Sequence, residues 1–130
     1  MRRLLTLPLL AALAACAGDE SLTAYGAADK TWVLTEIDGA PALARTTLSF
    51  PEPGRLAGRA PCNAYSGAQT APYPWFEVGP IASTKVACPD LAFEQSYFAA
   101  LSAMTLSEVS GDILVLSTPE GREMVFKADG

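Results

Sequence analysis

The chain of 130 residues contains no histidine. Histidine is the usual proton carrier near neutral pH, the usual base beside a serine or cysteine nucleophile, and the commonest zinc ligand. Its absence excludes Ser-His and Cys-His catalysis and histidine-based zinc sites. We therefore expect a protein that is not an enzyme and that binds no cofactor or metal.

Basic residues are also scarce, with nine Lys and Arg against fourteen Asp and Glu. Two of the nine are Arg2 and Arg3, so a chain without its first fifteen residues has seven basic residues against fourteen acidic ones, and its formal charge changes from −5 to −7. An acidic surface repels phosphate. Nucleic acids and anionic headgroup layers are therefore disfavoured as partners.

The N-terminus has the pattern of a secretory signal peptide, because Arg2 and Arg3 precede an almost wholly apolar run over residues 4–15. This run is shorter than the ~20 residues that a membrane-spanning helix needs. Its end, Leu-Ala-Ala-Cys at residues 13–16, resembles the bacterial lipobox. We expect residues 1–15 to be removed and Cys16 to carry membrane lipid. The alternative is cleavage by ordinary signal peptidase, which would release a soluble protein.

The segment after the cysteine, residues 16–28, is small and polar and predicts a flexible tether, followed by a single domain over residues 29–130. Ala17, rather than an aspartate, follows Cys16, which resembles an outer-membrane address. We expect the protein to be anchored in the outer membrane and to face the periplasm.

Short apolar stretches separated by turn residues predict strands over residues 31–37, 46–50, 55–59, 75–78, 81–86, 112–117 and 122–127. Asp38-Gly39 and the segment 118–121 predict tight turns. Asp90 can cap a helix over residues 91–104, whose expected inner face carries Leu91, Glu94 or Gln95, Phe98, Leu101 and Met104. Strands on both sides of one helix predict an α+β fold with a mainly antiparallel sheet.

Cys62 and Cys88 are the two cysteines that remain once Cys16 carries lipid. In an exported protein such a pair favours a disulfide, which would stabilise the fold by roughly 3 kcal/mol in the chain-entropy model. A nucleophilic Cys62, or a mixed metal site with nearby Asp90, is the alternative, although neither has a histidine to support it.

Two further groups of residues are functional candidates. Glu36 and Asp38 alternate on one strand, but a solvated edge that runs into the Asp38-Gly39 turn explains them better than a catalytic carboxylate pair. Most aromatic residues are expected in the core, namely Trp32, Phe50, Tyr65, Trp75, Phe76, Phe93, Phe98 and Phe126. A curved sheet could still leave an apolar cavity for a lipid tail or a peptide.

Several of these motifs together resemble the META domain (HslJ-like) family of small bacterial envelope proteins, over about residues 30–128. The resemblance rests on Trp-Val-Leu at 32–34, Ile-Asp-Gly at 37–39, Leu-Ser-Phe at 48–50, Gly58, Cys-Asn-Ala-Tyr-Ser-Gly at 62–67 and Thr-Lys-Val-Ala-Cys at 84–88. Pro61 and Val86 depart from it, because a glycine and a methionine are common at these places.

The resemblance implies an antiparallel sheet, curled toward an open barrel, with a helix packed on it. It also implies a non-enzymatic envelope module loosely tied to stress tolerance, with no catalytic residues to carry over. Asn63 and Tyr65 are best explained as turn and core residues, with ligand binding as the lesser alternative. We expect a lipid-anchored binding or accessory module that meets another envelope protein; the alternative is a carrier that holds a hydrophobic ligand inside the sheet.

Overall fold

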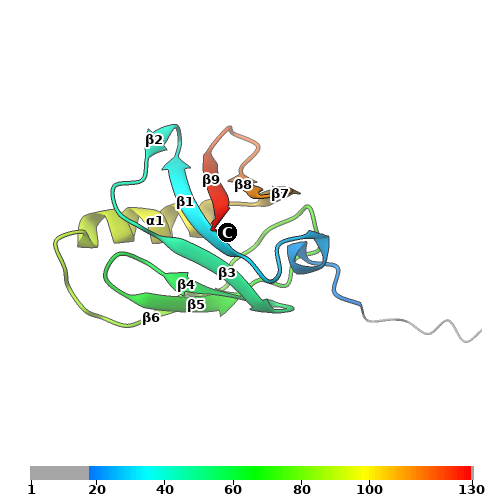
Figure 1. The fold of residues 1–130 in the computed structure, drawn as a ribbon, viewed down its shortest axis with the longest axis horizontal. Coiled ribbons are helices and arrows are strands. Elements are labelled where there is room, and N and C mark those ends of the chain that lie inside the picture. The colour runs from blue at the N-terminus through cyan, green and yellow to red at the C-terminus, as the bar shows by residue number, and fades with distance from the viewer. Residues whose placement is uncertain (1–17, 130) are drawn as a thin grey trace, which may run out of the picture.

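The computed structural model describes residues 18–129 (Figure 1). It confirms an α+β fold in which one α-helix packs on a mostly antiparallel sheet of nine strands. The elements are η1 (Leu22–Tyr25), β1 (Thr31–Ile37), β2 (Ala40–Pro41), β3 (Thr47–Glu52), β4 (Arg55–Arg59), β5 (Ala64–Ala68), β6 (Ala82–Ser83), α1 (Leu91–Ala103), β7 (Leu106–Ser110), β8 (Ile113–Ser117) and β9 (Glu123–Asp129).

The strand order is β6-β5-β4-β3-β1-β9-β8-β7, and β2 pairs with β1 outside this path. β1 and β9 therefore lie at the middle of the sheet, and they come from opposite ends of the domain sequence. In the described part of the chain the outer strands β6 and β7 do not pair with each other, so the curled sheet stays open. The backbone of the 72–76 loop covers β7, through the Trp75–Leu106 bridge and a hydrogen bond from Ser107 N to Pro74 O (2.7 Å).

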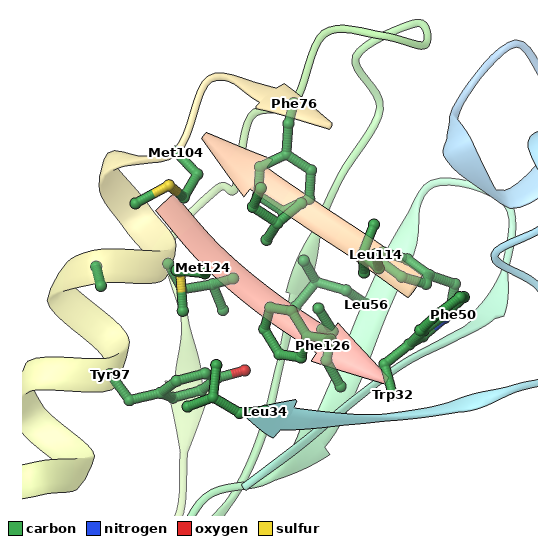
Figure 2. Close-up of a cluster of buried hydrophobic side chains, with 14 of the residues drawn as sticks. Trp32, Leu34, Phe50, Leu56, Phe76, Tyr97, Met104, Leu114, Met124 and Phe126 are labelled. Atoms are coloured by element: carbon green, nitrogen blue, oxygen red, sulfur yellow. The ribbon is translucent and has the colours of Figure 1, made fainter. Parts of the chain in front are cut away.

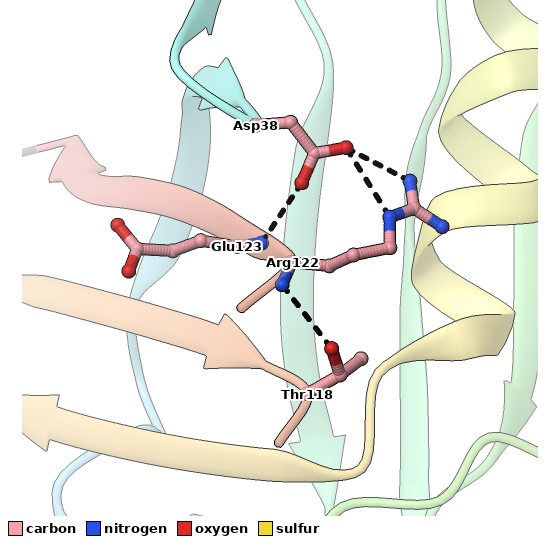
Figure 3. Close-up of polar contacts among 4 residues, drawn as sticks. All are labelled: Asp38, Thr118, Arg122 and Glu123. Atoms are coloured by element: carbon pink, nitrogen blue, oxygen red, sulfur yellow. Dashed lines mark hydrogen bonds and ion pairs between the residues drawn. The ribbon is translucent and has the colours of Figure 1, made fainter. Parts of the chain in front are cut away.

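Both predicted tight turns form. Asp38 and Gly39 have φ of 50° and 81° between β1 and β2, which is the two-residue hairpin geometry that Asp-Gly favours. The Asp38 carboxylate accepts bonds from the Arg122 guanidinium (3.0 Å) and from Glu123 N (3.0 Å), and so ties this turn to the start of β9 (Figure 3). These bonds, the Glu123 N–H first, lower the pKa of Asp38. Asp38 is thus a structural clamp beside the β8–β9 turn.

Alternate residues of the central strands fill the space between the sheet and the helix (Figure 2). β1 contributes Trp32 and Leu34, and the facing pairs Leu114–Phe126 and Leu116–Met124 join β8 to β9. Every one of these side chains is at most 4 % exposed. The period of two in the sequence thus gives one continuous packed core.

The helix buries part of the expected stripe, namely Glu94, Leu101 and Met104, but Tyr97 and Ala100 take the places expected for Leu91 and Phe98. Its buried residues are Glu94, Tyr97, Ala100 and Leu101, and Met104 follows at the C-cap. Leu91 and Phe98, expected on the inner face, are only partly buried. Asp90 occupies the N-cap position, but its side chain makes no capping hydrogen bond; its backbone carbonyl accepts Glu94 N (3.0 Å) instead.

The expected tether over residues 16–28 is corrected by the structure. Leu22 and Ala27 are fully buried, and the indole Nε1 of Trp32 donates to the Ala27 carbonyl (3.0 Å). Residues 21–28 are therefore part of the domain, because burial of Leu22 and Ala27 outweighs the polar character of their neighbours. The signal peptide and Cys16 lie outside the described residues. No helix of residues 18–129 is long and apolar enough to cross a membrane.

Two expected strands are also corrected. Residues 75–78 form a loop with a single bridge at Trp75, and of 81–86 only Ala82–Ser83 is a strand. Trp75 is 58 % exposed rather than in the core, whereas Phe76 is 2 % exposed. Phe93 and Phe98 pack at the border of the core. Residues 75–78 do alternate between exposed and buried side chains, but they run along the edge of β7 as a loop and do not form a strand.

A close approach of backbone and side chain makes Gly58 necessary. An added Cβ at Gly58 would lie 2.1 Å from the Thr47 carbonyl oxygen and 2.7 Å from the Tyr65 hydroxyl. The same hydroxyl donates to that carbonyl (2.7 Å). Neither atom can move away without breaking this hydrogen bond between two strands.

We therefore predict that Gly58→Ala lowers the free energy of unfolding by about 1–3 kcal/mol or more, as overpacking in a core does. Urea unfolding measures this loss. Gly67→Ala is the matched control, since its new Cβ would meet its nearest neighbours at an ordinary 3.6 Å. Equal stability of the two variants would contradict the packing account.

Candidate functional site

A buried carboxylate fastens the helix to the sheet. Glu94 is 2 % exposed, and its Oε1 accepts the backbone N–H groups of Cys62 (3.0 Å) and Asn63 (2.9 Å). Its Oε2 accepts Nδ2 of Asn63 (2.7 Å). Three donors on one carboxylate compensate the removal of a charge from water, which is otherwise very costly.

The Asn63 side chain extends this network to the loop between β6 and α1. Its Nδ2 also donates to the Val86 carbonyl (2.9 Å), and its Oδ1 accepts Thr84 Oγ1 (2.8 Å) and Val86 N (2.7 Å). Both donors and both acceptor positions of the amide are thus occupied within the protein. Asn63 holds three segments together: the β4–β5 connection, the loop and the helix.

A disulfide closes the same region. Cys62 and Cys88 are bonded, with their α-carbons 5.5 Å apart and 26 positions between them in sequence. The bond joins the β4–β5 connection to the loop before the helix, three residues ahead of its first residue, and it lies next to the Asn63 network. The structure therefore pairs the two cysteines as expected, which leaves neither sulfur free as a nucleophile or metal ligand.

A cleft of about 270 Å³ opens beside this network. It is lined by Asn63, Ser83, Thr84, Lys85, Val86, Ala87, Leu91, Glu94, Gln95 and Phe98. Val86 lines this cleft and is 60 % exposed. An apolar side chain exposed at a cleft can mark an interaction site. The hydrogen bonds of the Val86 backbone to Asn63 fix its position, so the cleft is a preformed surface feature.

Tyr65, in β5, packs its ring against Tyr97 and Phe98 of α1. The Tyr65 hydroxyl donates to the Thr47 carbonyl. The Tyr97 hydroxyl, 2.5 Å from that of Tyr65, therefore donates to the Tyr65 oxygen. Burial raises the pKa of Tyr97, and burial next to Tyr97 raises the pKa of Tyr65 well above its usual value. Both phenols are neutral structural groups inside the core, and both rings pack on Phe98, which lines the cleft.

The remaining sequence candidates do not come together. Asp38 lies in a turn and binds Arg122, while Glu36 is in β1, so the two carboxylates have different surroundings. Among residues 18–129 no three Cys, Asp or Glu side chains gather in a way that could hold a metal ion.

The comparisons with known proteins agree with this fold. The model of the META domain family matches residues 21–130. The chain belongs to the META domain family. This match begins at the segment that the structure packs against the core, nine residues before the start expected from the motifs.

Solved structures show the same fold at low sequence identity. An NMR structure of a protein from Burkholderia xenovorans is 21 % identical, with a TM-score of 0.62 over 83 % of this chain and 86 % of that one. A crystal structure of a DUF4847 family protein from Bacteroides vulgatus ATCC 8482 is 11 % identical, with a TM-score of 0.67 over 82 % and 96 % of the two chains. None of the curated proteins matches this chain.

In this META domain, the sequence predicts Asn63 in a turn and the cysteine pair, but it does not predict the roles of three buried polar residues, Glu94, Tyr97 and Gln69. Glu94 is predicted only as part of a helical stripe, and its position among apolar residues is the signal of its burial. Tyr97 and the buried Gln69, whose Oε1 accepts Glu77 N (2.9 Å), carried no such signal. The partner of Tyr97 lies 32 residues away, whereas Gln69 bonds within its own loop, to Ala71 and Glu77.

We predict that Glu94→Gln lowers the free energy of unfolding by about 1–3 kcal/mol. The new amide would bring an N–H donor against the Asn63 amide nitrogen or the two backbone N–H groups, because all three partners of Glu94 are donors. Urea unfolding measures the change. Exposed Glu108 in β7 gives the control Glu108→Gln, which should stay within about 0.5 kcal/mol of the native protein. A Glu94→Gln protein as stable as this control would contradict the network.

Proposed function

We propose that the protein is a non-enzymatic, lipid-anchored envelope protein whose META domain recognises another envelope protein at the cleft beside Val86. The observation that carries the proposal is the exposed Val86 side chain, held on a rigid loop by Asn63 and Glu94. In this proposal the domain supports envelope integrity as an accessory module, which is consistent with a role in stress tolerance.

The size of the cleft favours a protein partner. Small-molecule sites have volumes of roughly 300–1,000 Å³, and the cleft has about 270 Å³. This volume lies just below that range, so the cleft can take an inserted side chain of a partner protein and leaves little room for a larger ligand. Lys85 at the same cleft offers a positive charge on an otherwise acidic protein, so the partner segment carries an apolar residue with an acidic neighbour.

The core disfavours the carrier alternative. Trp32, Phe126, Leu114 and Tyr97 are fully buried, and with their neighbours they occupy the concave face of the sheet (Figure 2). A lipid tail inside the sheet would have to displace several of these side chains. Each such displacement costs about 2–5 kcal/mol, as judged from large-to-small changes in protein cores.

The proposal of a non-catalytic protein is supported by how the buried polar groups are used. The polar atoms that Glu94, Asn63 and the Tyr65–Tyr97 pair would need for catalysis form hydrogen bonds within the protein. A catalytic carboxylate needs a free oxygen directed toward a substrate. Glu94 instead directs both oxygens at donors of its own chain.

For the anchor, we predict that growth with labelled palmitate labels the protein and that Cys16→Ser abolishes the label. The acyl chains on Cys16 would hold the mature protein on the membrane, since each buried CH₂ contributes ~0.8 kcal/mol. Mature protein with an unmodified Cys16 or Ala17 at its N-terminus would exclude the anchor.

For the binding surface, we predict that a photoreactive amino acid at position 86 cross-links one envelope protein in living cells. The same amino acid at position 43 is the matched control, because Leu43 is also exposed (77 %) but lies on the β2–β3 connection. Phe98→Asp at the cleft should abolish the product from position 86. Identical products from both positions would contradict the cleft, and a stoichiometric acyl species in native mass spectra of the Cys16→Ser protein would support the carrier instead.

A further inference from the structure

We propose that the domain lies directly on the membrane, with Tyr25, Pro72, Tyr73 and Trp75, here called the aromatic patch, in contact with a zwitterionic phospholipid surface. This inference rests on the lipid anchor at Cys16 and adds an orientation to it. Two independent observations carry it: the short chain between Cys16 and the folded domain, and the exposed aromatic residues where that chain joins the domain.

The chain joins the domain very close to the lipid anchor. The carbonyl of Glu20 accepts Tyr73 N (2.7 Å), and the Asp19 carboxylate accepts Ser21 N (2.9 Å). Leu22 is then fully buried. An extended residue spans at most ~3.6 Å, so the four residues from Cys16 to Glu20 reach at most about 14 Å.

The length of this chain limits the distance between the domain and the membrane surface. The headgroup region on each side of a bilayer is roughly 5–8 Å thick, as the difference between the hydrocarbon core and the whole bilayer shows. A cysteine with buried acyl chains lies in this region. With at most about 14 Å of chain, the domain surface around Glu20 stays within about 14 Å of this cysteine, close enough for its side chains to reach the headgroups.

The surface around Glu20 is aromatic. Tyr25 is 54 % exposed and stacks on Tyr73, with ring centroids 4.5 Å apart and planes at 12°. Trp75 is 58 % exposed two residues further along. Thr70 and Pro72 line both the cleft beside residues 18–21 and the cleft beside Trp75, so the patch is one continuous surface. η1 and the 69–81 loop lie at the same end of the molecule (Figure 1).

The aromatic patch is rigid and chemically suited to a headgroup layer. Phe76 N donates to the Thr105 carbonyl (2.9 Å), and the Trp75–Leu106 bridge holds the loop against β7. Tryptophan and tyrosine are enriched at membrane interfaces, because their rings combine an apolar body with a polar group. Asp19 and Glu20 lie beside the patch and repel anionic lipid, which favours a zwitterionic surface.

The test uses the mature lipidated protein in phosphatidylcholine vesicles with brominated acyl chains, which quench nearby tryptophan. The protein has two tryptophans, and Trp32 is fully buried. We expect Trp75 to lose most of its emission relative to unbrominated vesicles. Trp75→Phe, which retains only Trp32, should show no loss. Equal emission of the native protein in both vesicle types would overturn the inference.

A matched control tests the orientation. Leu43→Trp in the Trp75→Phe background places an exposed tryptophan on the β2–β3 connection, away from η1 (Figure 1). It should keep its emission, and quenching equal to that of Trp75 would overturn the single orientation. The mass of the N-terminal peptide shows whether Cys16 carries lipid, and so distinguishes failure of the orientation from failure of the anchor. Lipid on Cys16 without quenching refutes only the orientation, whereas absence of lipid refutes the anchor and this inference together.

Discussion

One buried carboxylate sets much of this structure. Glu94 stands on the helix face that meets the sheet, where a charge without partners would be prohibitively costly. The backbone of residues 62–63 and the Asn63 amide supply the donors it needs. The helix, the β4–β5 connection and the loop before the helix must therefore be in place together, because moving any one of them would leave a buried charge or amide without a partner.

This constraint gives the protein a rigid end and explains its exposed valine. Asn63 fixes both the N–H and the carbonyl of Val86, so the side chain of Val86 stays in solvent. The β6–α1 connection lies at the end of the molecule away from η1 (Figure 1). A domain seated on the membrane through its aromatic patch would thus present this cleft away from the bilayer, where another envelope protein can reach it.

The sequence predicted the parts whose cause is local. Asp38-Gly39, the hairpin around residues 118–121 and the helix follow from turn chemistry and periodicity, and the cysteine pair follows from the compartment expected for an exported protein. Residues 21–28 and Trp75 could not be placed in this way. The burial of Leu22 depends on the 69–81 loop and on β7, and the exposure of Trp75 depends on how its loop pairs with β7; these partners are distant in sequence.

The candidate site shows the same division. Asn63 was expected in a turn, and it is buried there. Its role follows from Glu94, which is 31 residues away, and no local pattern connects the two. Glu94 fell on an apolar helical stripe, and an acidic residue in such a place signals a buried partner. The sequence could suggest that a partner exists, but only the fold identifies it.

Hydrogen exchange measured by NMR on the native protein tests this account most directly. The amides of Cys62, Asn63 and Val86 lie outside the strands and donate only to the Glu94 and Asn63 side chains. If the network unites helix, connection and loop, these amides should exchange only with global unfolding, at the same opening free energy as the amides of β1 and β9. Exchange at the rate of exposed loop amides would contradict the central place given to Glu94.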